Sequence, residues 1–218
     1  MANGLIGVTR GRPSIARFVW YWMYCLCVVV LPISSLAAQT PAEVVQRTIK
    51  DLLYIQTELK DASRSAQRQW EIEQVVRRAF DYEEMAERSL GDGREKTIVA
   101  DRRQFIRLFV QVLRDDLADK LRDYSVAQVV YLSERRGADG IHVLMAPAGP
   151  EIDARIEFQL VHRSGAWLVI DVIIDGASIV ANYQTQFSRI LREGSFSDLM
   201  EYLKQRAVVA QVTGHIHS

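Results

Sequence analysis

The spacing of apolar residues changes once along the chain and divides it into a helical part and a sheet. From Val45 to Leu121, apolar residues recur every three or four positions, as they do on one face of an α-helix. Thr40 and Glu43, with a proline between them, have the spacing of a helical capping box, so the first helix is predicted to begin there. Asp81 is a predicted N-cap inside this region. The predicted helices cover about residues 41–59, 70–80, 82–90 and 98–122.

After Tyr124 the period of apolar residues changes to two, which is the pattern of a half-buried β-strand. The clearest alternation lies in residues 152–160, where apolar side chains alternate with Asp, Arg, Glu and Gln. Turns that contain glycine or proline separate the runs, so we expect an antiparallel meander. The predicted strands cover residues 125–134, 141–146, 152–160 and 166–174. In the last of them, four side chains are expected to share one face: Leu168, Ile170, Val172 and Ile174.

A second helical region follows the predicted sheet. Ser178 is a predicted N-cap, and Gly194 is the predicted stop of the helix that it begins. A last short helix contains Leu199 and Leu203, and residues 207–218 are predicted to form a loose tail. Helices followed by strands and again by helices predict an α+β fold. Its parts are N-terminal helices at about 41–122, a curved four-stranded antiparallel sheet at about 124–175, and C-terminal helices at about 178–206, packed on the sheet around an apolar cavity.

The N-terminal segment is predicted to direct export. Three arginines precede an apolar run at residues 18–31, and small residues follow up to Ala37. This is the pattern of a secretory signal peptide, which we expect to occupy residues 1–38 and to be cleaved. A retained membrane anchor is the alternative, although the run is shorter than the about 20 residues that span a bilayer. Both cysteines lie in this segment, so the mature chain would have no disulfide, no thiol nucleophile and no thiolate-bound zinc.

Charge and motifs exclude several classes of function. The chain has 27 basic and 27 acidic residues, a balance that does not favour a nucleic-acid partner. The segment Gly91–Thr97 superficially suggests a phosphate-binding loop, but Glu95 stands where such a loop needs a glycine before the lysine. The four histidines form no cluster with metal-ligand spacing, and no Gly-x-Ser-x-Gly motif is present. We therefore expect no metal, no cofactor and no catalytic residues.

One enzymatic hypothesis remains open. A curved sheet capped by helices can enclose an apolar cavity, in which a carboxylate with a raised pKa can act as a base. Asp171 and Asp175 interrupt an apolar strand and are the candidates for an exported isomerase- or hydrolase-like enzyme. The structural alternative places Asp171 on the outer face of the sheet and Asp175 in a turn at Gly176. A third hypothesis is an exported adaptor whose apolar core is simply full.

Polar and aromatic residues of the last strand and the next helix form a series: Trp167, Asp171-Val172, Gly176, Ser178, Asn182-Tyr183 and Gln186-Phe187. Shorter motifs lie on either side of it: Phe80-Asp81-Tyr82, Met85-Ala86, Leu90-Gly91, Phe105, Phe109, Gly194, Asp198-Leu199 and Leu203-Lys204. Over about residues 41–206, this order resembles the MlaC family of periplasmic phospholipid-binding proteins, also called toluene-tolerance auxiliary proteins. The chain departs from the family pattern at Arg94, Asp101, Leu117 and Gln184.

The resemblance implies a lipid-binding domain over residues 39–206 and a role in transport rather than catalysis. Such a protein would carry a phospholipid across the periplasm. Its partners would be an outer-membrane lipoprotein–porin complex and an inner-membrane ABC transporter. The departures from the family pattern leave the lipid itself open, with a hopanoid as the alternative cargo.

A phospholipid carrier needs a dry pocket, because exposing roughly 30 CH₂ groups to water costs on the order of 25 kcal/mol. We expect the acyl chains to lie between the sheet and the helices, with the headgroup near the mouth in water. The predicted wall residues come from two helices and three strands: Met85, Phe105, Phe109, Leu113, Val143, Met145, Ile156, Phe158, Leu160, Ile170 and Val172.

Overall fold

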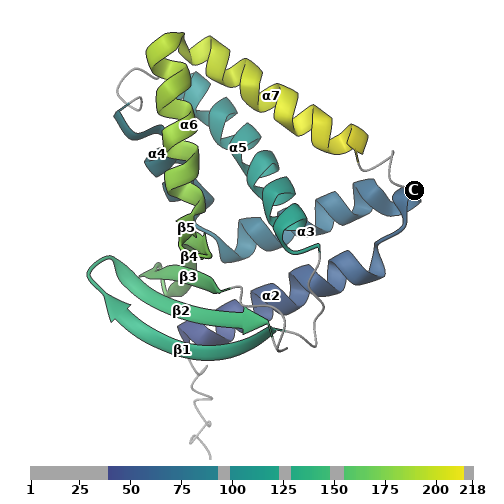
Figure 1. Cartoon of the computed structure of the whole chain (residues 1–218), viewed down its shortest axis with the longest axis vertical. Coiled ribbons are helices and arrows are strands. Elements are labelled where there is room, and N and C mark those ends of the chain that lie inside the picture. The colour runs from purple at the N-terminus through teal and green to yellow at the C-terminus, as the bar shows by residue number, and fades with distance from the viewer. Residues whose placement is uncertain (1–38, 93–98, 123–128, 148–154, 214–218) are drawn as a thin grey trace, which may run out of the picture. The chain divides into compact units, whose positions relative to one another are not determined.

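The computed structural model describes residues 39–92, 99–122, 129–147 and 155–213. It confirms the α+β class, with helices before and after an antiparallel sheet (Figure 1). The helices are α2 (Pro41–Glu58), the 3-10 helix η1 (Ala62–Arg64), α3 (Ser65–Ala79), α4 (Tyr82–Leu90), α5 (Val99–Lys120), α6 (Ile179–Glu193) and α7 (Phe196–Thr213). The strands are β1 (Val129–Gly137), β2 (Gly140–Pro147), β3 (Ile156–Arg163), β4 (Ala166–Ile174) and β5 (Ala177–Ser178).

The sheet is the predicted antiparallel meander, but it has five strands rather than four. Its order is β1-β2-β3-β4-β5, and the additional strand β5 is only two residues long. Two-residue turns join β3 to β4 at Ser164-Gly165 and β4 to β5 at Asp175-Gly176, and all four residues have positive φ. Positive φ at both central residues matches the right-handed twist of a hairpin, and glycine reaches it without steric cost. The second of these turns leads into β5, whose last residue, Ser178, is the N-cap of α6.

A β-bulge in β4 corrects the predicted faces of that strand. Gln159 pairs with Asp171 and Leu160 pairs with Val169, so Ile170 is an extra residue without a partner opposite it. The extra residue changes the alternation, because side chains on a regular strand point to opposite faces in turn. Val169 and Val172 therefore join the core, while Ile170 is buried outside it. The prediction that Ile170 and Val172 share one face was wrong, because sequence alternation does not reveal a bulge.

The predicted helix caps are confirmed. Thr40 Oγ1 accepts a hydrogen bond from Glu43 N at 3.3 Å, and Glu43 Oε2 accepts one from Thr40 N at 2.9 Å. Asp81 Oδ1 caps α4 by accepting from Glu84 N at 3.1 Å, and Ser178 Oγ caps α6 by accepting from Ala181 N at 2.9 Å. These contacts satisfy backbone N–H groups that have no partner within the helix.

Some boundaries differ from the prediction. Helix α7 continues to Thr213, so part of the predicted tail is helical. Strands β1 and β3 begin at Val129 and Ile156; the predicted strand residues 125–128 and 152–154 lie outside the described ranges, and Arg155 is described but is not part of β3. Strand β1 is the edge of the sheet and is largely exposed, with Val130 at 40%.

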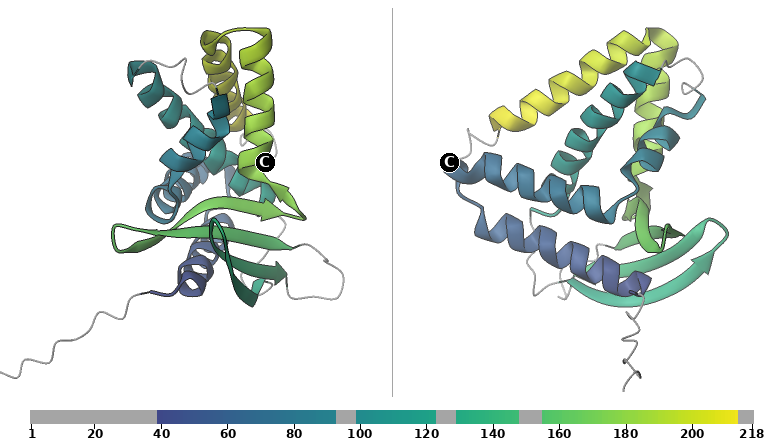
Figure 2. Two further views of the ribbon diagram at one scale, coloured as in Figure 1. Left: turned by 90° about the vertical axis from the view of Figure 1, so that its left-hand side faces the viewer. Right: turned by 180° about the vertical axis from the view of Figure 1, so that it is seen from behind.

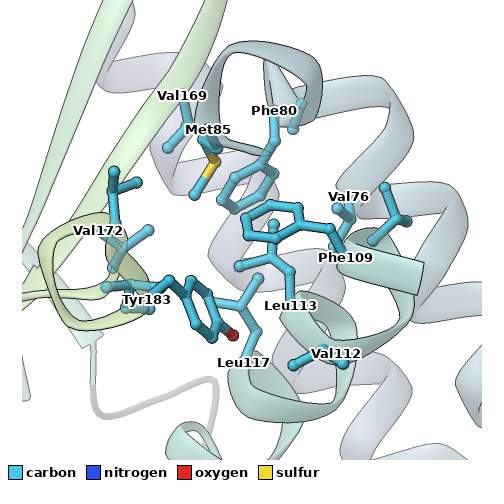
Figure 3. Packing of buried hydrophobic residues seen from close by; sticks show 14 of the residues in the cluster. Val76, Phe80, Met85, Phe109, Val112, Leu113, Leu117, Val169, Val172 and Tyr183 are labelled. Carbon is cyan, nitrogen blue, oxygen red and sulfur yellow. The ribbon is translucent and has the colours of Figure 1, made fainter. Parts of the chain in front are cut away.

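The helices and the inner face of the sheet share one apolar core. Figure 3 shows Phe80, Phe109 and Leu113 on one side of the strand residues Val169 and Val172, in the same cluster. The junction between α3 and α4 is fixed to β4, because Asp81 N donates to the carbonyl oxygen of Val169 at 2.8 Å. Helix α2 contacts β1 and β2 along the inner curve of the sheet (Figure 2). The core is therefore enclosed by elements from both ends of the sequence.

Candidate functional site

The eleven predicted wall residues are all buried, with exposed fractions of at most 5%. Ten of them belong to one continuous apolar cluster that extends from the sheet into the helices. Ile170 is the exception, because the bulge turns it away from this cluster. The structure thus brings together side chains from α4, α5, β2, β3 and β4, as the sequence predicts. Their contact with a lipid stays a prediction.

Aromatic rings fill the part of the core between α5, α6 and α7. The ring centroids of Phe105 and Phe187 are 5.8 Å apart in an edge-to-face arrangement, and those of Phe109 and Tyr183 are 5.2 Å apart. Phe196 of α7 lies 6.1 Å from Phe105. We call these five residues the aromatic cluster. Only Phe105 and Phe109 of this cluster were predicted as wall residues, although Tyr183 and Phe187 have the i, i+4 spacing of one helix face.

The hydroxyl group of Tyr183 connects the aromatic cluster to a polar network. Tyr183 is 3% exposed, and its hydroxyl donates to Asp116 Oδ2 at 2.5 Å. Arg206 Nη2 of α7 donates to the other oxygen of Asp116 at 2.5 Å. Burial, together with the charge of Asp116, raises the pKa of Tyr183 well above its ordinary value. A single carboxylate on α5 therefore holds side chains from both α6 and α7.

The raised pKa of Tyr183 predicts a loss of stability at alkaline pH. The unfolded chain releases this proton near pH 10 whereas the folded protein retains it, so stability present below about pH 10 is lost at about 1.4 kcal/mol per pH unit above it. Tyr183→Phe removes this contribution together with one hydrogen bond. In urea unfolding, the variant is expected to be less stable at pH 8 by about 1–2 kcal/mol, and this difference should shrink at pH 11. Tyr54→Phe, at a 60% exposed position, is the control. A difference that stays constant between the two pH values would contradict the assignment.

The carboxylates proposed for an enzyme have structural partners. Asp171 is 4% exposed and accepts hydrogen bonds from Val172 N, Ser178 Oγ and Val180 N, at 2.8, 2.5 and 3.2 Å. The register places it on the outer face of the sheet, as the structural alternative predicted, because Asp171 pairs with Gln159 whereas the core residue Val172 pairs with Phe158, although its side chain is buried there. Asp175 lies in the turn, where its Oδ1 accepts from Arg155 N at 2.9 Å. Both oxygens of Asp171 are occupied by donors that fix the start of α6, so the geometry favours a structural role.

A buried arginine links α5 to α3, and no sequence pattern indicated it. Arg114 is 5% exposed and forms a bidentate pair with Asp115, at 2.8 Å for each contact. Its Nη1 also donates to Glu73 Oε2 of α3 at 3.2 Å. Burial raises the pKa of Asp115 even though the neighbouring guanidinium lowers it.

The described residues offer neither a metal site nor a membrane span. No group of three or more His, Cys, Asp or Glu side chains in the described ranges could hold an ion. His142 contacts Glu157 through Nδ1 and Asp139 through Nε2. The hydrogen bond between His142 and Asp139 lowers the pKa of Asp139. Among the helices whose residues are described, none combines the length and the apolar character needed to cross a bilayer.

A surface depression of about 360 Å³ lies between α4 and α6. Its lining is mostly polar: Glu87, Arg88, Gly91, Asp92, Ser178, Val180, Ala181 and Gln184. Acyl chains would gain little from such a lining, because the free energy of burial scales with the apolar area removed from water. The buried apolar cluster is therefore the better candidate for a lipid.

Comparison with known proteins agrees with this fold. A family model described as MlaC protein matches residues 45–205. The chain is also similar to a solved structure, a phospholipid-binding protein from Ralstonia solanacearum in complex with a phospholipid. The sequences are 18% identical and the TM-score is 0.65, over 79% of this chain and 99% of that chain. No curated protein matches the chain in sequence.

Proposed function

The chain belongs to the MlaC family, and on this basis we propose that it is a carrier that binds a phospholipid in its apolar core. The observation that carries the proposal is the continuous cluster of buried apolar side chains shared by the sheet and the helices. A structure with the same fold, from Ralstonia solanacearum, was solved with a phospholipid bound. In this proposal the two candidate carboxylates have structural roles, which their hydrogen bonds to the backbone and to Ser178 support.

The physics of lipid transfer supports a carrier without an energy source of its own. The large free-energy cost of exposing acyl chains mostly cancels when a lipid passes from one apolar environment to another. Loading and unloading can then be reversible at this protein. Any energy for net transport would come from a partner.

The proposed route lies between two membranes. The signal-like segment at residues 1–38 would export the protein to the periplasm, where it would be released by cleavage. There it would exchange a phospholipid between an outer-membrane lipoprotein–porin complex and an inner-membrane ABC transporter. These partners and this location come from the family resemblance.

Native mass spectrometry of the exported and purified protein tests the proposal, followed by solvent extraction and identification of any lipid. A stoichiometric phospholipid adduct is the expected result. A hopanoid adduct would show that the protein is a lipid carrier with a different lipid as its cargo. Protein that is empty and also takes up no lipid from phospholipid vesicles would refute the carrier.

A matched pair of substitutions tests where the acyl chains lie. Val143→Phe adds volume to the core at a fully buried position, and Val130→Phe adds the same volume at a 40% exposed position on the neighbouring strand. Overpacking is expected to cost Val143→Phe about 1–3 kcal/mol of stability. The bound lipid per folded protein should fall for Val143→Phe and stay unchanged for Val130→Phe. If both variants fold and bind equal amounts of lipid, the acyl chains do not lie against the inner face of β2.

A further inference from the structure

Helix α7 covers the end of the apolar core farthest from the sheet (Figures 1 and 2). Its main contacts are with α5 and α6. Leu199 and Leu203 are fully buried, and Phe196 packs against Phe105 of the aromatic cluster. The main contacts of α7 include no strand of the sheet. It can therefore move away from α5 and α6 without disrupting the order of the sheet.

The connection before α7 is short. Helix α6 ends at Glu193 and α7 begins at Phe196, so only Gly194 and Ser195 join them. Ser195 and Asp198 cap the start of α7 reciprocally, since Asp198 Oδ2 accepts from Ser195 N at 2.8 Å and Ser195 Oγ accepts from Asp198 N at 3.3 Å. These caps are local to α7 and would persist if the helix swung about the connection.

Polar contacts farther along α7 hold it against the other two helices. Arg206 pairs with Asp116 of α5, and Tyr202 donates to Gln186 Oε1 of α6 at 2.8 Å. Arg206 Nη1 also donates to the hydroxyl oxygen of Tyr202 at 3.3 Å. The side chains of Arg206 and Asp116 are 37% and 25% exposed, so water can solvate both charges when the pair separates. A partly exposed pair of this kind is weak enough to open reversibly.

We propose that α7 is a lid over the aromatic cluster, held closed by Arg206 and Asp116, and that its opening sets the rate at which lipid enters and leaves the core. The role in lipid exchange rests on the proposed function. Arg206 and Asp116 are positioning residues, since they act through α7 and not on the cargo. The closed lid buries Leu199, Leu203 and the rings beneath them, which accounts for a core that is sealed in this structure.

Arg206→Gln tests the lid, because it removes the ion pair and leaves the hydrogen bond between Tyr183 and Asp116 in place. Arg78→Gln is the matched control, since it removes another exposed ion pair, with Asp51 at 2.7 Å, that joins α2 and α3. Two measurements are made on each protein. Hydrogen–deuterium exchange reports the opening of α7, and transfer of a fluorescent phosphatidylethanolamine to phospholipid vesicles reports lipid exchange.

In Arg206→Gln, amide exchange in α7 and lipid transfer should both accelerate by about three- to tenfold. Amides of β3 should exchange as in the unmodified protein, and Arg78→Gln should change neither measurement. Unchanged exchange in α7, or equal acceleration in α7 and β3, would overturn the lid. Faster exchange in α7 with unchanged lipid transfer would overturn its role in lipid entry. A protein that binds no lipid at all refutes the carrier, and the exchange of α7 amides still decides whether the helix opens separately.

Discussion

Phe109→Ala is expected to lower the free energy of unfolding by about 4 kcal/mol, because it removes a fully buried ring and leaves a cavity that the core can only partly close. The ring joins the aromatic cluster to the rest of the apolar core. It contacts Phe105 and Tyr183 in the aromatic cluster, and it lies beside Phe80 and Leu113 (Figure 3). For a domain of this size the melting temperature should fall by roughly 8–16 °C. Circular dichroism measures the free energy during urea unfolding and the melting temperature during thermal unfolding.

Trp70→Ala is the matched control for this substitution. Trp70 is a larger aromatic residue on α3, but 59% of it is exposed, so its removal should cost less than about 0.5 kcal/mol. Equal losses for the two variants would show that the cluster around Phe109 is not the core of the folded protein.

Added lipid gives a second comparison, because a ligand that binds only the folded state raises the stability of that state. A lipid-bound protein should therefore be more stable than the same variant stripped of lipid.

The features predicted correctly from the sequence are those whose interacting residues lie close together along the chain. The caps at Thr40, Asp81 and Ser178 were predicted because the donor and the acceptor lie within three residues of each other. The wall of the core was predicted because helix and strand periods place apolar residues on one face. In both cases a short stretch of sequence contains the whole physical cause.

The features that the sequence did not predict join distant segments. Arg206 lies 90 positions from Asp116, and Tyr183 lies 67 positions from it. No local pattern distinguishes these residues from other charged or aromatic residues on helix surfaces. Arg114 was missed for the same reason, since its burial depends on Glu73 of another helix. The bulge at Ile170 was missed because an inserted apolar residue in the run Leu168–Ile170 looks like ordinary strand sequence.

The end of α7 shows a second limit of prediction from sequence. Its residues beyond Arg206 are mostly small and apolar, without the alternation of apolar and polar faces that marks a helix in sequence. A helical prediction based on periodicity therefore stops at Arg206. The structure continues the helix to Thr213, so the pair between Arg206 and Asp116 lies inside α7 rather than at a frayed end.

Asp171→Ala is expected to destabilise the protein by about 4 kcal/mol, because it leaves two backbone N–H groups and one hydroxyl group without their acceptor in a buried position. The start of α6 depends on this carboxylate. Ser178 donates to Asp171 while accepting from Ala181 N, so loss of Asp171 also loosens the N-cap. Asp51→Ala, which removes an exposed ion pair with Arg78, should cost less than about 1 kcal/mol and serves as the control.

Asp171→Asn separates the structural role from a catalytic one. The amide oxygen of Asn can still accept from Val172 N and Val180 N, but its NH₂ group would donate to Ser178 Oγ and leave the serine hydroxyl hydrogen without an acceptor. We therefore expect an intermediate loss of about 1–2 kcal/mol with lipid binding retained. A loss as small as that of Asp51→Ala for both substitutions at Asp171 would contradict its structural role. A carboxylate kept at that position without any benefit to stability would make the enzymatic hypothesis the better explanation of a buried charge in an apolar strand.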